Sequence, residues 1–149
     1  MRIVPDATLL IRAHSRSRTR ARRLLYALLE RGHTLVLSNE MIVEVIRVLR
    51  YPHFQDLYGL TEAELLEYAQ YLQTVADIVI LDARYGAPVL RDPGDMHVLQ
   101  TAERGGADIL CTSDGDFCND EAVISYCLSR GIEICSEASL LARLVENAS

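Results

Sequence analysis

Five acidic side chains in this 149-residue sequence are placed so that a folded chain can bring their carboxylates together. They are Asp6, Glu44, Asp95, Asp114 and Asp116. Burying unpaired carboxylates is costly, so a cluster of them requires a cation, and oxygen ligands favour Mg²⁺ or Mn²⁺ over zinc. Such an ion lowers the pKa of a water, orients it and stabilises charge on a leaving oxygen. The acids therefore predict a metal site equipped to hydrolyse phosphodiester bonds.

Each acid also has a purely structural interpretation. Aspartate is a favoured helix N-cap, glutamate pairs with arginine three residues further along a helix, and Asp-Gly is a common turn dipeptide. These alternatives apply to Asp6 (cap of a helix at 7–11), Asp92 (cap before Pro93, with Asp95 in the first turn), Glu44 (paired with Arg47) and Asp114 (turn with Gly115).

The residues around the acids predict the elements that position them. Short β-rich runs at 2–5, 34–37, 78–81, 108–112 and 132–134 alternate with helical patterns at 17–31, 39–50, 93–104 and 121–129 and with helices that begin near 61 and 136. This alternation predicts an α/β fold of three layers, in which helices cover both faces of a mostly parallel sheet of about five strands. Ligands in such folds bind beyond the carboxyl ends of the strands, where the strand order reverses. Asp6 and Asp114 follow two different strands and are expected at that edge.

Composition narrows the possible functions. All 15 basic residues are arginine, which excludes a Schiff-base lysine, the P-loop phosphate cradle and a kinase-type lysine, and disfavours a phosphoacceptor receiver-like domain. The four cysteines form no Cys-x-x-Cys pair, so zinc is not expected. No apolar run approaches the ~20 residues of a membrane-spanning helix, and no cleavable signal pattern is present. We therefore expect one cytoplasmic domain that spans residues 1–149.

Motifs run through nearly the whole chain in a characteristic order. An apolar strand leads into Asp6-Ala7-Thr8, and a second strand is followed by Ser38 and, six residues later, by Glu44. The helix that carries Glu44 ends in Leu-Arg-Tyr-Pro at 49–52. The most specific runs are Asp-Pro-Gly-Asp at 92–95 and Gly-Ala-Asp-Ile-Leu-Cys-Thr-Ser-Asp-Gly-Asp at 106–116. In this order the motifs resemble the PIN-domain family, in its VapC-like toxin branch.

The resemblance implies cleavage of single-stranded RNA with Mg²⁺ or Mn²⁺. It also implies a small antitoxin protein as partner, and a homodimer. The residues it assigns are Asp6, Glu44, Asp95 and Asp114 as catalytic and metal-binding acids, Asp116 as a further metal ligand, and Thr8, Thr112 and Asp92 in auxiliary roles.

Two positions depart from the family pattern. Thr8 stands where the family has asparagine, and it offers one hydroxyl in place of an amide. Pro5 removes a backbone donor from a strand expected at the centre of the sheet, directly before Asp6. These departures keep a second function open, namely a degenerate PIN module that binds RNA or a protein partner without cleavage.

The arginines are concentrated in the segment 12–31, which holds seven of them and one acid, a local charge of +6 in a chain of net charge −6. Arg16, Arg20 and Arg23 are spaced to share one helical face. With Arg12 they are candidates for RNA binding, because arginine binds phosphate through two donors. Two alternatives remain: a solvated face that balances acids elsewhere, or a docking surface for an acidic segment of an antitoxin-like partner.

Overall fold

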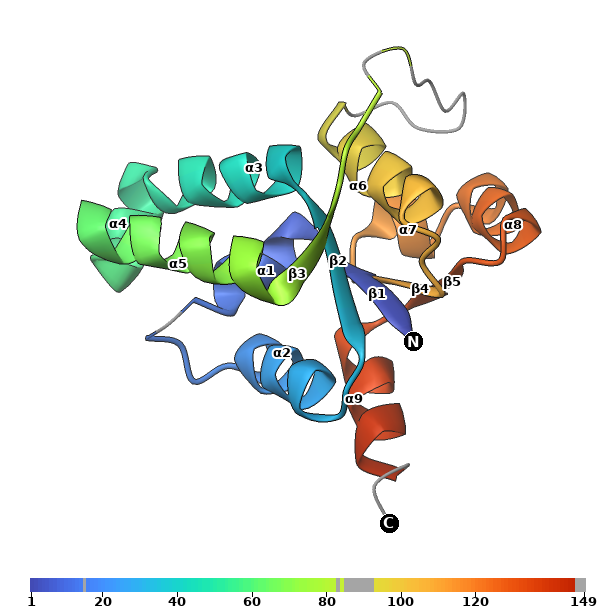
Figure 1. Cartoon of the computed structure of the whole chain (residues 1–149), viewed down its shortest axis with the longest axis horizontal. Helices are drawn as coiled ribbons and strands as arrows, with labels where there is room; N and C mark the ends of the chain where they lie inside the picture. Colours follow the sequence, from blue (N-terminus) through green and yellow to red (C-terminus); the bar gives the residue numbers. More distant parts are fainter. Residues whose placement is uncertain (15, 83, 85–92, 147–149) are drawn as a thin grey trace.

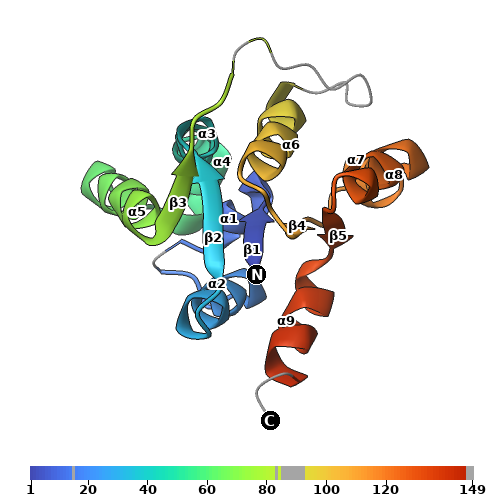
Figure 2. The same ribbon diagram turned by 45° about the vertical axis from the view of Figure 1, so that its right-hand side comes forward.

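The computed structural model describes residues 1–14, 16–82, 84 and 93–146, and a parallel sheet of five strands forms the centre of this part of the chain (Figure 1). The strands are β1 (Arg2–Pro5), β2 (Thr34–Ser38), β3 (Ala76–Val79), β4 (Ile109–Cys111) and β5 (Glu133–Cys135). They lie side by side in the order β3-β2-β1-β4-β5 (Figure 2). The chain adds β2 and β3 on one side of β1 and then places β4 and β5 on the other. The strand order therefore reverses between β1 and β4.

Helices cover both faces of this sheet. They are α1 (Ala7–Arg12), α2 (Arg20–Glu30), α3 (Asn39–Leu49), α4 (Pro52–Tyr58), α5 (Glu62–Val75), α6 (Pro93–Arg104), α7 (Gly115–Cys118), α8 (Glu121–Ser129) and α9 (Glu137–Glu146). Helices α2 and α3 pack on β2 and α5 packs on β3, whereas α6 packs on β1 and β2 and α8 packs on β5. Because right-handed crossovers that run in opposite directions place their helices on opposite faces, the layers are α/β/α as predicted.

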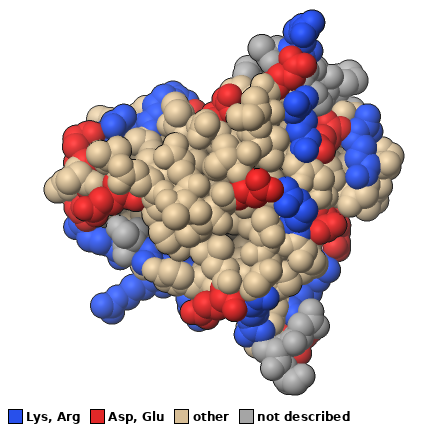
Figure 3. Space-filling view, viewed as in Figure 1, with Lys and Arg blue, Asp and Glu red and all other residues tan. Residues whose placement is uncertain are grey.

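The inner strands are apolar on both faces, as expected for strands of a covered parallel sheet. The runs 3–4, 35–37 and 109–111 are buried and join the helices in a single cluster of core residues. None of the helices in the described part of the chain is both long and apolar enough to cross a membrane. On the face shown in Figure 3, most charged side chains lie around the rim, and acidic and basic side chains also lie next to each other near the middle.

Pro5 fits the end of β1 without interrupting the pairing that positions Asp6. Pairing of β1 with β2 ends at Ile3, whereas pairing with β4 continues to Pro5, which is in register with Cys111. The next backbone N–H, that of Asp6, donates to the carbonyl oxygen of Cys111 at 3.0 Å. The proline therefore lies where the strand has already parted from β2, and the last bond to β4 is kept.

Four local predictions differ from the structure. Residues 52–58 form α4, a helix that was not predicted because Tyr51-Pro52 indicated only an end; Pro52 also begins the new helix at its first position, where proline is well tolerated. The short α7 was not predicted either. Strand β3 begins at Ala76, two residues before its predicted start. Helix α2 begins at Arg20, three residues after its own predicted start. Residues in the unpredicted α4 line the pocket described next.

Candidate active site

Asp6 lies at the carboxyl end of β1, at the point where the strand order reverses. Its Oδ1 accepts a hydrogen bond from the backbone N–H of Leu9 at 2.8 Å, so it also caps α1. Asp6 is therefore both a helix cap and a residue at the strand end where the site was predicted. Asp6 is only 9% exposed, and this burial raises the pKa of its carboxyl group against the lowering effects of its hydrogen bonds and of Arg12. Positive charge beside Asp6 would favour its ionised form.

Thr112, the residue after β4, links the two strand ends. It is 1% exposed, and its hydroxyl donates to Asp6 Oδ2 at 2.5 Å and accepts from the backbone N–H of Asp114 at 3.0 Å. One hydroxyl therefore fixes the second oxygen of Asp6 and the backbone at the start of α7. This geometry supports the auxiliary role predicted for Thr112.

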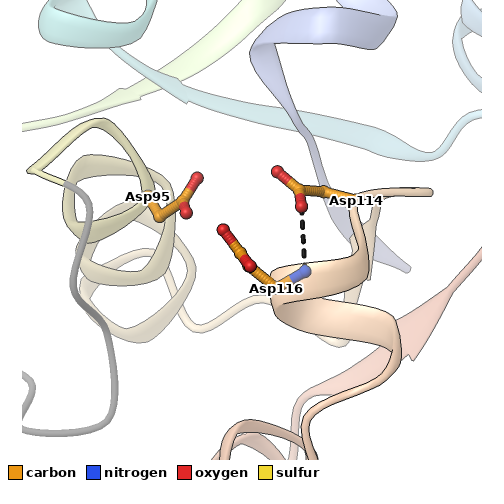
Figure 4. A group of neighbouring side chains, drawn as sticks. All are labelled: Asp95, Asp114 and Asp116. Carbon is orange, nitrogen blue, oxygen red and sulfur yellow. Dashed lines mark hydrogen bonds between the residues drawn. The ribbon is translucent and has the colours of Figure 1, made fainter.

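Three further acids converge in front of this strand end (Figure 4). Asp95 comes from the first turn of α6, Asp114 caps α7, and Asp116 lies in the first turn of α7. Each offers an oxygen, and these oxygens lie within 4.8 Å of one another. The backbone N–H of Asp116 donates to Asp114 Oδ1 at 2.9 Å, which orders the α7 side of the group. Three carboxylates at this spacing fit a hard cation with oxygen ligands such as Mg²⁺ or Mn²⁺.

Four of the predicted acids line one pocket of about 500 Å³, namely Asp6, Glu44, Asp95 and Asp114. The other predicted acid, Asp116, belongs to the three-acid group but is not among the residues that line the pocket. Thr8 also lines the pocket and is exposed. The remaining auxiliary candidate, Asp92, lies outside the described residues. The structure therefore places four of the five predicted acids around one pocket and the fifth, Asp116, next to two of them.

Glu44 lies at the pocket and also forms the ion pair with Arg47 that its structural interpretation predicts. It lines the pocket from α3, and its Oε2 also accepts from Arg47 Nη2 at 2.5 Å and from Arg47 Nε at 3.1 Å. Arg47 in turn reaches the hydroxyl of Tyr51 at 2.5 Å. Glu44 thus already has a guanidinium partner on its own helix.

Three aromatic residues of the pocket were missed by sequence reasoning: Phe117 of α7 and two residues of α4. Phe54 and Tyr58 of α4 both line it, with ring centroids 6.0 Å apart and an interplanar angle of 22°. The sequence does carry a signal for α4: Pro52 at the first helical position and Gly59, with a φ of +59°, at the end. The pocket therefore combines an acidic part with an apolar, aromatic part.

The predicted arginine face does not form as a single helical surface. Arg16 precedes α2 and pairs with Glu64 of α5 at 2.8 Å, while Arg20 lies 3.7 Å from Glu137 of α9. Arg23 is exposed on α2. Arg12 alone of the four lines the acidic pocket. It pairs with Glu137, a contact that no local pattern predicts. The spacing argument was wrong because the helix begins after Arg16.

Comparison with known proteins agrees with this geometry. A family model described as "PIN domain" matches residues 2–116, which include the five acids. The fold is similar to that of a chain in the crystal structure of VapBC2 from Rickettsia felis bound to a DNA fragment from their promoter, with a TM-score of 0.60 and 11% identity over 91% of this chain and 98% of that chain. No curated protein matches the sequence. Since the family model matches more than half of the chain, the protein belongs to the PIN-domain family.

Proposed function

We propose that this PIN domain is a cytoplasmic endoribonuclease that hydrolyses phosphodiester bonds of single-stranded RNA with Mg²⁺ or Mn²⁺. The observation that carries the proposal is the convergence of Asp95, Asp114 and Asp116 within 4.8 Å, beside the pocket lined by Asp6 and Glu44. PIN-domain membership adds support, because the resemblance implies this activity. That residues 1–149 form one domain stays a prediction.

The described side chains divide the work as follows. Asp95, Asp114 and Asp116, with Asp6 beside them, would hold the ion, and Glu44 would contribute when its carboxylate turns from Arg47. When bound there, such an ion would supply an activated water and stabilise charge on the leaving oxygen. Thr112 orients Asp6, and Arg12 offers donors to a phosphate of the RNA at the same pocket. The exposed Arg23, with Arg16 and Arg20, remains a candidate for contacts to more distant phosphates.

The partners follow from the same family assignment. We propose that the protein is the toxin of a toxin–antitoxin pair and that a small antitoxin protein covers the pocket. The fold similarity to VapBC2 supports this proposal. We also propose a homodimer, which light scattering of the purified protein would test.

The decisive experiment is cleavage of a 5′-labelled single-stranded RNA by the purified protein with Mg²⁺, with Mn²⁺ and with EDTA. We expect internal cuts with either ion and none with EDTA, and weaker cleavage of double-stranded RNA and of single-stranded DNA of the same sequence. Cleavage that persists in EDTA would contradict the metal assignment.

A second function, RNA or protein binding without cleavage, is favoured by the Glu44–Arg47 pair and by Thr8 in place of asparagine. Titration with Mn²⁺ in a calorimeter separates the two proposals. Mn²⁺ binding that disappears in Asp114→Asn supports the nuclease. RNA binding without detectable Mn²⁺ binding supports the degenerate module.

A further inference from the structure

The C-terminal helix carries a buried carboxylate that lies outside the residues matched by the family model. Glu137, in the first turn of α9, is 2% exposed. An ionised carboxylate removed from water is strongly destabilising unless charge and hydrogen bonds compensate it. Its surroundings therefore reveal what this residue is there to bind.

The compensation comes mainly from Arg12, the last residue of α1. Arg12 Nη1 donates to Glu137 Oε2 at 3.0 Å, and Arg12 Nη2 donates to Oε1. Arg20 Nε lies 3.7 Å from Oε2 as a second positive charge. A two-point contact of this kind fixes the plane of the guanidinium as well as its position. Glu137 thus determines where Arg12 is held.

The position that Glu137 imposes on Arg12 is at the acidic pocket. Arg12 lines it beside Asp6 and Asp114, and it is the only cation among the described residues that do so. A guanidinium has five N–H donors, and two of them serve Glu137. Three remain for a ligand. A phosphate that approaches this pocket meets several carboxylates and a single arginine to receive it.

Other ion pairs of the arginine-rich segment are built differently. Arg16 also contacts Glu64 at two points and donates to the carbonyl oxygen of Gly59, but both side chains of that pair are partly exposed, and exposed pairs contribute little to stability. The Arg12–Glu137 pair joins α1 to α9 around a buried acid. The difference identifies Arg12 as the arginine whose orientation is built into the fold.

We propose that Glu137 is a positioning residue that holds the guanidinium of Arg12 at the pocket, where its remaining N–H groups bind a phosphate of the RNA substrate. The proposal rests on the function proposed above. The proposal gives the segment after residue 116 a role in substrate binding. That segment acts on the pocket through the two-point contact between Glu137 and Arg12.

The test compares Glu137→Gln, Arg12→Gln and Arg12→Lys with the matched control Glu133→Gln. Glu133 pairs with Arg143 at 2.9 Å on the exposed side of β5 and α9, so its replacement removes the same charge from the same region. The dissociation constant of a fluorescent single-stranded RNA is measured by anisotropy in EDTA at several salt concentrations. KM and kcat are measured with Mg²⁺, and thermal unfolding is followed for every variant.

A pure charge effect and a positioning role predict opposite changes in the RNA affinity of Glu137→Gln. Removing a negative charge favours RNA binding in general, so Glu133→Gln should bind the same or slightly tighter. If Glu137 positions Arg12, Glu137→Gln weakens binding roughly tenfold, as does Arg12→Gln, since each loses a charge-assisted contact to phosphate. The double variant should be no weaker than Arg12→Gln alone, because the two residues act through one contact. KM should rise by a similar factor while kcat changes little.

Each outcome is informative about one proposal or the other. Folded Glu137→Gln that binds RNA as tightly as Glu133→Gln overturns the inference. If Glu137→Gln does not fold, Arg12→Lys decides: wild-type affinity overturns the inference, and weakened affinity supports it, because lysine keeps the charge and loses the fork. Wild-type protein that does not bind the RNA overturns it as well. Protein that shows the expected losses of binding but does not cleave supports this inference and contradicts the nuclease proposal.

Discussion

Acids lie at both ends of the parallel strands, and their surroundings differ between the two ends. We call the end where the strands begin the amino edge of the sheet and the end where they finish the carboxyl edge. At the amino edge, Arg2 contacts two acids: its Nη2 lies 2.7 Å from Asp77 Oδ2, and its backbone N–H donates to Asp108 Oδ2 at 2.8 Å. Its Nε also donates to the carbonyl oxygen of Gly105 at 2.7 Å. One arginine thus joins the starts of β1, β3 and β4 and balances the acids beside it.

At the carboxyl edge the acids approach one another instead. The oxygens of Asp95, Asp114 and Asp116 lie within 4.8 Å, and Arg12, the one described cation lining the pocket, is already held by Glu137. Like charges at this spacing repel, so a bound cation would stabilise this arrangement. An acid next to a strand is therefore structural at one edge and suited to chemistry at the other. The direction of the parallel strands decides which is which.

The largest expected difference is between two single variants, one that removes an acid at the carboxyl edge and one that removes an acid at the amino edge. Asp114→Asn should reduce RNA cleavage by more than about a hundredfold, because a lost metal ligand removes several kcal/mol of charge stabilisation. Asp77→Asn should leave cleavage within about twofold and change stability by less than about 1 kcal/mol, as for other exposed ion pairs. Initial rates with Mn²⁺ and urea unfolding measure both quantities. Equal losses of activity in the two variants would remove the distinction between the edges.

An intermediate effect on cleavage is expected from removing the hydroxyl of Thr112, which contacts the acids at the carboxyl edge. Thr112→Val removes the donor to Asp6 and the acceptor for the Asp114 N–H, so we expect a loss of about 10–100-fold in kcat, typical of residues that orient metal ligands. Thr101→Val is the control, since Thr101 is equally buried, donates to the backbone oxygen of His97 and lies 2.9 Å from the hydroxyl oxygen of Ser38. Both changes should destabilise the protein by roughly 1–3 kcal/mol. A parallel fall in kcat in both variants would make Thr112 a folding residue only.

Much of this contrast could be predicted from sequence. The apolar runs predicted the parallel sheet, and Asp6 and Asp114 were expected at the edge where they lie, because strand direction and the reversal of order are properties of the whole pattern. The capping box at Thr61 and Glu64 is also present as its spacing predicts. Local signals and the fold agree at these positions.

The contacts that cross between distant elements could not be predicted. Glu137 and Arg12 are 125 residues apart, and nothing in their local sequence indicates that they meet. The helical spacing of Arg16, Arg20 and Arg23 failed because Thr19 caps α2 and so excludes Arg16 from it. Periodicity describes residues within an element, whereas partner choice depends on packing between elements.

The smallest expected effect is a change in the pH dependence of stability. It concerns two histidines, one next to the wall of the pocket and one at the amino edge. His14 is 2% exposed, and its ring packs 4.3 Å from that of Tyr58, which lines the pocket. Burial lowers the pKa of His14, and Arg22 and Arg16 lower it further against an opposing effect of Glu64. At the amino edge, partial burial and the N-terminal amine, 3.0 Å from Nδ1, lower the pKa of the more exposed His33.

The sign of the pH dependence follows from these shifts. As pH falls below about 6.5, the unfolded chain binds protons that the buried ring of His14 resists, so the free energy of unfolding decreases until His14 itself is protonated in the folded state. Urea unfolding at pH 7.5 and pH 5.5 should show a decrease that is reduced in His14→Gln and reduced less in His33→Gln. Comparing each variant between the two pH values cancels the packing change that the substitution causes. A larger reduction in His33→Gln would place the proton-sensitive contact at the amino edge, away from the wall of the pocket.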